Sequence, residues 1–255
     1  MVLEAVTPYN YYRFTAARPG DAEFYGELMG RIGYDGADKP EFTEAAREIA
    51  PTDQVLDVGC GAGAFSVPCA GAYRGIDTNR AAVDEARGMG RSVHCSAVQD
   101  ERPDTYDVVT LFQVLEHVEE PREFLRACLG CLRAGGRLIV STPDMDGFMG
   151  SVTNEILNYP PHHMTWWSTD SLRALIEDCG CEVTKVWHEP LRRDHLRAAF
   201  SALLWPRDEA HLTESGRFRL VELWAKLLAR AAAGKWTQVP FVKGHSVLMV
   251  ARKRK

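Results

Sequence analysis

The chain has 255 residues, of which 45% are hydrophobic and 25% charged, and its formal net charge at pH 7 is −5. This length accommodates one large α/β domain with a sizeable core. The acidic balance argues against a broad nucleic-acid-binding or membrane-binding surface, and no apolar segment approaches the roughly 18 residues that a membrane span needs. There is no basic N-terminal segment followed by an apolar run, and the seven cysteines are scattered, so we expect a cytoplasmic protein with reduced cysteines.

The first fifty residues are predicted to be helical. Apolar residues recur at helical spacing between Tyr25 and Ile32, and a second helix over residues 41–50 ends before Pro51. We expect this region, residues 1–50, to form a helical cap.

From residue 54 onward, short apolar runs alternate with helical segments. The expected strands are QVLDVG (54–59), AYRGID (72–77), SVHCSA (92–97), YDVVTLF (106–112), RLIVST (137–142), EVTKVWH (182–188) and HSVLMVA (245–251). Helix-start residues stand between several of them: Asn79, Pro121, and Ser168 or Thr169. This alternation predicts an α/β fold, a Rossmann-like doubly wound and mostly parallel sheet with helices on both faces.

One connection is too long for this pattern. More than fifty residues separate the last two expected strands, and they include apolar helical segments around 196–205 and 218–233. We therefore expect a single domain, 1–255, with a core at 51–190 and 243–255 and a helical insertion at 191–242 over the ligand-binding edge of the sheet.

Glycines follow the first core strand directly. Gly59, Gly61 and Gly63 allow a tight turn and close approach of a ligand to the backbone, and the helix expected next would offer exposed N–H groups. Asp77, at the end of the next strand, is placed to accept hydrogen bonds from both hydroxyls of a ribose. A dinucleotide and S-adenosylmethionine both fit this pattern. Asp57, just before the loop, would repel a pyrophosphate but can anchor an ammonium group, which favours S-adenosylmethionine.

Three longer motifs accompany the loop: LDVGCGAGAF (56–65), GIDTNRAAVDEAR (75–87), and the stretch from YDVVTLFQVLEH to RLIVSTPD (106–144). With them the chain resembles the class I S-adenosylmethionine-dependent methyltransferases, and within these the small-molecule branch that includes ubiquinone-biosynthesis-type O-methyltransferases. The resemblance covers about residues 50–190. It also implies an antiparallel last strand.

The resemblance implies a set of residues that bind S-adenosyl-L-methionine and release S-adenosyl-L-homocysteine. They are Asp57, Gly59, Gly61 and Gly63 at the methionine part, Asp77 at the ribose, Thr78 or Asn79 beside the adenine, Ala97 and Val98 at the adenine edge, and Gln113 toward the methionine. Capping of the next helix is an equal alternative for Thr78 and Asn79. In addition, an aromatic N-terminal segment can close over the cofactor, so that Arg13 pairs with its carboxylate; a plain surface segment is an equal alternative.

The loop NYPPHHMTWWS (158–168) follows the fifth core strand and returns over the same sheet edge. A histidine here can take the proton from an acceptor during in-line methyl transfer. His162 and His163 are both candidates for this catalytic base. Because adjacent side chains on an extended backbone point in opposite directions, at most one of them faces the methyl group.

We expect no metal. The run after the fourth core strand reads Gln113-Val-Leu-Glu116-His117, and an amide is a poorer ligand for a hard cation than a carboxylate. A metal site could still form with His162 or His163, but we interpret His117 as packing at a helix start or as a wall of the site. The partner is expected to be a small-molecule acceptor, aromatic or sugar-derived, methylated at a hydroxyl oxygen. N-methylation of an amine or amino-sugar stays open, and so does a non-catalytic S-adenosylmethionine-binding protein. The oligomeric state is not set by the sequence.

Overall fold

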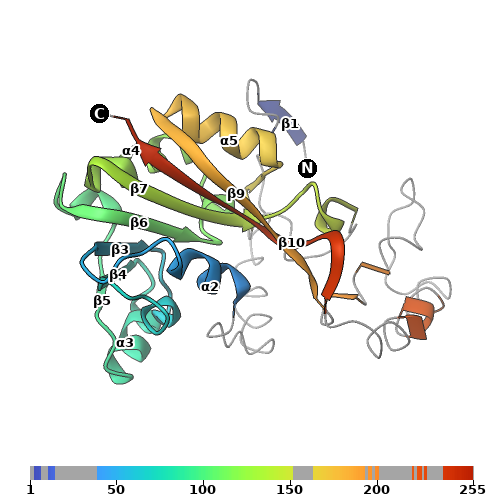
Figure 1. Cartoon of the computed structure of the whole chain (residues 1–255), viewed down its shortest axis with the longest axis horizontal. Helices are drawn as coiled ribbons and strands as arrows, with labels where there is room; N and C mark the ends of the chain where they lie inside the picture. The colour runs from blue at the N-terminus through green and yellow to red at the C-terminus, as the bar shows by residue number, and fades with distance from the viewer. Residues whose placement is uncertain are drawn as a thin grey trace.

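Seven strands form one sheet in the order β5-β4-β3-β6-β7-β10-β9 (Figure 1). Their bounds are β3 (Gln54–Val58), β4 (Ala72–Asp77), β5 (Val93–Cys95), β6 (Tyr106–Phe112), β7 (Leu132–Pro143), β9 (Cys181–Arg192) and β10 (Gln238–Lys253). This computed structural model describes residues 3–6, 11–14, 39–151, 163–192, 195–196, 199–200, 220, 223–225, 227–228 and 238–254.

Strand directions follow the prediction. β3 runs parallel to β4 and β6, β4 to β5, and β6 to β7, whereas β10 is antiparallel to both β7 and β9. The core strands are apolar on both faces because helices cover both faces; in β6, Val108, Val109 and Leu111 are all fully buried. The predicted Rossmann-like sheet with an antiparallel last strand is therefore confirmed.

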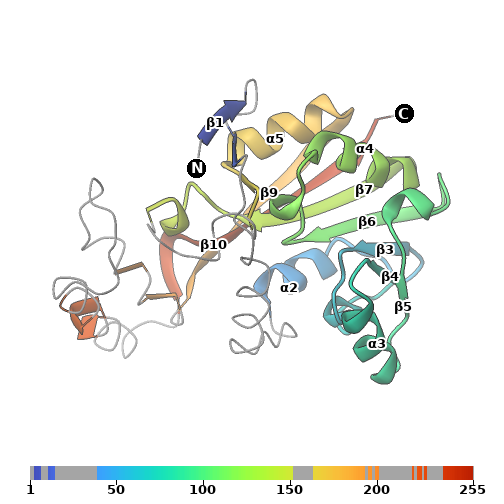
Figure 2. The ribbon, with the colours of Figure 1, turned by 180° about the vertical axis from the view of Figure 1, so that it is seen from behind.

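Helices lie on the two faces of the sheet, as Figures 1 and 2 show. Their bounds are α2 (Pro40–Ala46), α3 (Arg80–Gly88), α4 (Pro121–Cys131) and α5 (Thr169–Asp178). Leu125 of α4 and Leu172 of α5 belong to the core cluster on one face, and Phe42 of α2 packs in the cluster on the other. The helices begin where the sequence predicts: the Asn79 side chain accepts hydrogen bonds from two backbone N–H groups of α3, and Ser168 forms a capping box with Ser171.

The N-terminal segment departs from the prediction. Residues Leu3–Val6 (β1) and Tyr11–Phe14 (β2) are strands, not helices. β2 pairs with β1 on one side and with β8 (Thr165–Trp166) on the other, in a separate three-stranded sheet. Aromatic residues such as these tyrosines are common in strands. The partner of β2, however, is β8, in which Trp166 pairs with Tyr12 from a distant part of the chain. The helix predicted around Tyr25 lies outside the described residues.

The glycine loop and the insertion also differ in detail. A three-residue 3₁₀ helix, Ala64–Ser66, follows the loop in place of the expected α-helix. β9 and β10 extend past the predicted core limits to Arg192 and from Gln238, so the 191–242 segment begins and ends as an antiparallel ribbon. Apart from His195, which lies in a turn, the described residues between them are helical, and the rest of the predicted insertion lies outside the described part. Among the described residues, no helix has the length and apolarity to cross a bilayer.

Leu125 tests the packing of α4 against the sheet, because its side chain is fully buried. Leu125→Ala should lower the free energy of unfolding by about 2–5 kcal/mol, through lost transfer free energy and a cavity. Met89→Ala, at a side chain that is 54% exposed, should change it by less than about 0.5 kcal/mol. Denaturant unfolding measures both, and equal effects would contradict this packing.

Candidate active site

The glycine loop connects the end of β3 to a ligand-binding edge. Gly59, Gly61 and Gly63 have φ values of 71°, 53° and 72°, a region that side chains disfavour. A Cβ on Gly59 would lie 2.6 Å from Val114 Cγ2, whereas a Cβ on Gly61 would meet no atom within 4 Å. The loop is thus closed on one side by Val114 and open at Gly61.

Asp77 ties this loop to the end of β4. Its Oδ2 accepts a hydrogen bond from the Gly61 N–H at 2.8 Å, and its Oδ1 accepts one from the Asn79 N–H at 2.7 Å. A carboxylate has about four lone-pair sites, so two further donors, such as ribose hydroxyls, can still bind. The two hydrogen bonds therefore fix the Asp77 carboxylate relative to the glycine loop.

A pocket opens beside Asp77. It is lined by Val58, Gly59, Ile76, Asp77, Thr78, Ser96, Ala97, Val98, Gln99, Val114, His117, Val118 and Phe124. The pocket brings together five of the predicted cofactor residues: Gly59, Asp77, Thr78, Ala97 and Val98. Phe124 and Gln99 have no sequence signal for this role, because only the packing of α4 and the turn after β5 places them here.

The other predicted cofactor residues lie elsewhere around this edge. Asn79 caps α3, and a Cβ on Gly63 would meet Val93 at 2.7 Å. Arg13 lies in β2 opposite Thr165 of β8; its side chain is outside the described part. Gln113 has a positive φ of 56°, and its amide turns toward Ser141, Ser246 and α2.

Asp57 is held in a buried hydrogen-bond network. Thr110 Oγ1 donates to its Oδ1 at 2.7 Å and Tyr73 Oη donates to its Oδ2 at 2.8 Å, and the residue is 2% exposed. Burial raises the pKa of Asp57 to about 6, although both hydrogen bonds act to lower it. With both oxygens bonded, Asp57 supports the base of the loop, and an ammonium group would have to share these oxygens.

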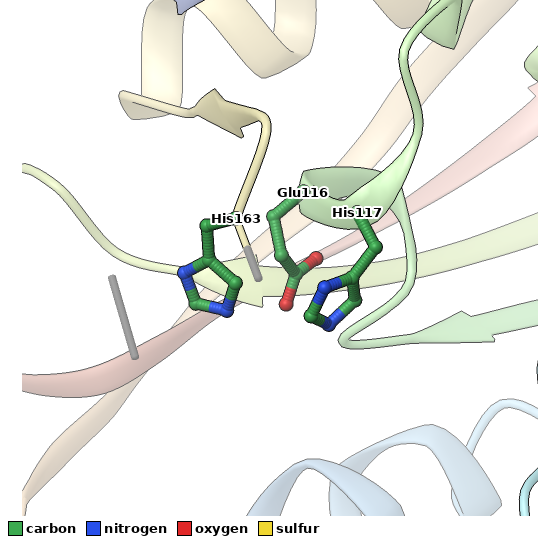
Figure 3. A group of neighbouring side chains, drawn as sticks. All are labelled: Glu116, His117 and His163. Carbon is green, nitrogen blue, oxygen red and sulfur yellow. The ribbon is translucent and has the colours of Figure 1, made fainter. Parts of the chain in front are cut away.

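A second group of side chains lies next to the pocket: Glu116, His117 and His163 (Figure 3). The Glu116 carboxylate lies between the two imidazoles, and one ligand-type atom of each residue is within 4.8 Å of the others. The ring centroids of His117 and His163 are 4.9 Å apart. Because His117 also lines the pocket beside Asp77, the group adjoins that pocket.

Backbone pairing brings His163 to this position. The Met164 N–H donates to the Glu116 carbonyl at 2.7 Å, and Thr165 Oγ1 donates to the Leu115 carbonyl at 3.3 Å. These bonds fasten the segment before β8 to the turn after β6. The other candidate base, His162, lies outside the described residues. Trp167, from the same loop, is fully buried in the core.

Glu116 has an unusual environment for a carboxylate. It is 1% exposed, and neither oxygen has a hydrogen-bond partner within the described part of the chain. Burial raises the pKa of Glu116 to about 7, with His117 acting in the opposite direction. The sequence does not predict a metal site at Glu116 and His117, because Gln113 replaces a carboxylate, although it leaves open a site completed by His162 or His163. The local pattern does not show which of these histidines approaches Glu116.

Two imidazoles and a carboxylate are also ligands that suit zinc and other first-row divalent cations. Ligand atoms around one cation lie at most about 4.4 Å apart when each bond is about 2.2 Å. A small inward movement would therefore let Glu116, His117 and His163 coordinate one ion. The group can act either as a proton acceptor or as a cation site.

Comparison with known proteins identifies the family of this chain. The profile of a methyltransferase domain family matches residues 34–186, more than half of the chain. The chain belongs to this methyltransferase family. S-adenosyl-L-methionine is accordingly the cofactor of this protein.

The relatives found by sequence match a smaller part of the chain than the family profile does. The chain is 34% identical, over 102 residues, to the mitochondrial ubiquinone biosynthesis O-methyltransferase of Schizosaccharomyces pombe; the match spans 35% of this chain and 37% of that protein. A methyltransferase from Thermotoga maritima, described as a possible histamine N-methyltransferase, superposes with a TM-score of 0.58 at 18% identity, covering 91% of this chain and 96% of that one. The [4+2]-cyclase SpnF superposes with a TM-score of 0.52 at 19% identity, covering 83% and 80%. The two structures show the shared fold alone.

Asp77→Ala should weaken the binding of S-adenosylhomocysteine about tenfold or more, since it removes charge-assisted hydrogen bonds to the ribose and releases the Gly61 N–H. Isothermal titration measures the dissociation constant. Asp84→Ala, which changes an exposed acid on the neighbouring helix α3, is the matched control and should leave it unchanged. Unaltered binding in Asp77→Ala would remove Asp77 from the cofactor site.

Asp57 should make stability depend on pH. Its pKa rises from 3.8 to about 6 on folding, so its favourable contribution is complete below the unfolded value and is lost as the pH rises through 6. The difference in unfolding free energy between Asp57→Asn and the wild type should therefore shift by about 3 kcal/mol in favour of the variant as the pH rises from about 3.5 to about 7. Denaturant unfolding at several pH values tests this, and a pH-independent difference would contradict it.

Proposed function

We propose that the protein transfers the methyl group of S-adenosylmethionine to a hydroxyl oxygen of a small-molecule acceptor, with His163 as the base. The position of the Glu116–His117–His163 group beside the cofactor pocket carries this proposal. The relatives named as ubiquinone biosynthesis O-methyltransferases, of which the S. pombe protein is one, support oxygen as the methylated atom. Because the match spans only 37% of that protein's length, its substrate is not transferred to this chain.

The proposed chemistry is an in-line displacement. The cofactor, when bound, supplies a methyl group already activated by a positively charged sulfur. The residues of this chain hold the acceptor oxygen opposite that methyl group, keep water out and take up the hydroxyl proton. As the oxygen–carbon bond forms, the carbon–sulfur pair of electrons stays on sulfur, and the proton moves to an imidazole nitrogen of His163.

His163 is the stronger of the two candidate histidines. It is 8% exposed and its ring lies 4.9 Å from that of His117, which lines the cofactor pocket. Histidine is the residue type whose ordinary pKa lies closest to neutral pH, which suits a general base. The Glu116 carboxylate beside it can stabilise the imidazolium that forms.

Two other functions remain as proposals. The N-methylation of an amine or amino-sugar would use the same cofactor half, and the possible histamine N-methyltransferase of T. maritima shares the fold. A protein that binds the cofactor without transferring its methyl group would also fit; the cyclase SpnF illustrates that this fold carries other chemistry. Methylation of any hydroxyl acceptor separates the first proposal from both.

His163→Ala should lower kcat by about 10²–10⁴-fold, because the acceptor proton loses its base. S-adenosylhomocysteine release during turnover of a panel of hydroxylated small molecules measures this. The dissociation constant of S-adenosylhomocysteine should stay unchanged, and His94→Ala, on β5 outside the pocket lining, should keep full activity. Unchanged turnover in His163→Ala would reject the base role.

A chelator separates the base from a cation site. If His163 acts as a base without a metal, activity survives EDTA. If activity is lost with EDTA and restored by one divalent cation, Glu116, His117 and His163 are ligands and the proton acceptor lies elsewhere.

A further inference from the structure

Large apolar side chains are exposed on the helical segment between β9 and β10. They are between 39% and 57% exposed: Leu220, Leu223, Trp224, Leu227 and Leu228. The segment is helical at each of these positions, and spacings of three and four residues place all of them on one face of a helix. We call this set of side chains the apolar stripe.

The stripe reverses the usual orientation of a helix on a globular protein, in which the large apolar side chains face the core. Ala225 lies on the opposite side of the helix and is fully buried, whereas the stripe faces outward. Elsewhere in the described part of the chain, the exposed large hydrophobic side chains are Val67 and Met89, each alone at the end of another helix. Single exposed residues need no explanation, but a contiguous apolar patch indicates an interaction surface.

The β9–β10 ribbon leads from the sheet toward the stripe. β7 and β9 are both antiparallel to β10 and therefore run in the same direction, so the ribbon leaves the sheet at the edge where the active site lies. The helical segment, coloured orange-red, is at the far right of Figure 1 and the far left of Figure 2, apart from the sheet and from the helices that cover it. The stripe is therefore presented on a projecting part of the molecule.

The sequence around the stripe is basic, although the whole chain is acidic. Residues 217–235 include five lysines and arginines and one acid, Glu222, whereas the formal net charge of the chain is −5. The acidic balance of the chain argues against a broad membrane-binding surface, but this segment is a narrow one with the opposite local charge. A negatively charged surface would attract it.

This local charge favours a lipid surface over a second copy of the chain as the occupant of the stripe. In a symmetric dimer the same patch meets itself, so two basic segments would lie against each other and repel. A helix with leucines and a tryptophan on one face, in a segment rich in basic residues, is typical of helices that lie in the plane of an anionic membrane. The stripe, at residues 220–228, is also much shorter than the roughly 20 residues of a transmembrane helix, which suits binding in that plane.

We propose that the apolar stripe binds the surface of a membrane that contains anionic lipids. The leucines and Trp224 enter the boundary between headgroups and acyl chains, and the lysines and arginines of residues 217–235 attract the lipid phosphates. This inference goes beyond the proposed methyl transfer, because it concerns where the protein acts and does not depend on which atom is methylated.

Co-sedimentation of the full chain with vesicles tests the proposal. We expect saturable binding to vesicles of phosphatidylcholine with about one quarter phosphatidylglycerol, and binding weaker by about tenfold or more to vesicles of phosphatidylcholine alone. Raising the salt concentration from about 0.1 M to about 1 M should weaken the binding to the anionic vesicles, because salt screens the charges.

The variants Leu223→Glu and Met89→Glu form a matched pair, because both side chains are apolar and 54% exposed. Leu223→Glu should weaken binding to the anionic vesicles about tenfold or more, since it places a negative charge within the stripe. Met89→Glu, at the end of α3, should leave this binding unaltered. Both variants should bind S-adenosylhomocysteine as the wild type does, which verifies that they fold.

Absence of binding to the anionic vesicles would overturn the inference, and so would equal losses in Leu223→Glu and Met89→Glu. Equal binding to the anionic and the neutral vesicles would reject the role of anionic lipid. A dimer in sedimentation equilibrium that Leu223→Glu dissociates, together with absent vesicle binding, would assign the stripe to a second copy of the chain.

Discussion

The parallel pairing of β3 with β4 and β6 is the constraint on which the site depends. Val58 pairs with Ile76 on one side and with Leu111 on the other, so the residues that follow these three positions emerge at one edge of the sheet. Gly59 and Asp77 are two of the residues that emerge there. The hydrogen bond from the Gly61 N–H to the Asp77 carboxylate then connects the loop after β3 to the end of β4. Without this register the glycines would have no carboxylate partner.

The same edge concentrates buried acids. Asp57, Glu41 and Glu116 are each at most 4% exposed, and burial raises the pKa of all three. Stability alone does not favour such groups, because an apolar residue of similar size would avoid the desolvation cost. Asp57 is compensated by two hydroxyl donors, whereas Glu116 has no hydrogen-bond partner among the described residues. Clusters of carboxyl groups with perturbed pKa values are typical of functional sites.

Much of this could be predicted from the residues because the relevant signals are local. Apolar runs ending in glycines identify the parallel strands, and Asn79 and Pro121 mark helix starts within one turn of where they occur. Strand β2 was predicted wrongly as part of a helical region. Its stabilisation comes from pairing with β8, and a window of neighbouring residues holds no information about a partner so distant in the chain.

The sequence by itself therefore determined the alternating fold, the glycine loop and the carboxylate at the end of β4, since each depends on residues near one another in the chain. Only the tertiary structure decided what faces that edge. His163 reaches Glu116 through a backbone hydrogen bond across 48 positions, from Met164 to Glu116, and Gln113 meets Ser246 across 133. Such contacts arise from the packing of β7, β8 and β10 around the end of β6, and packing at long range leaves no periodic trace in the order of residues.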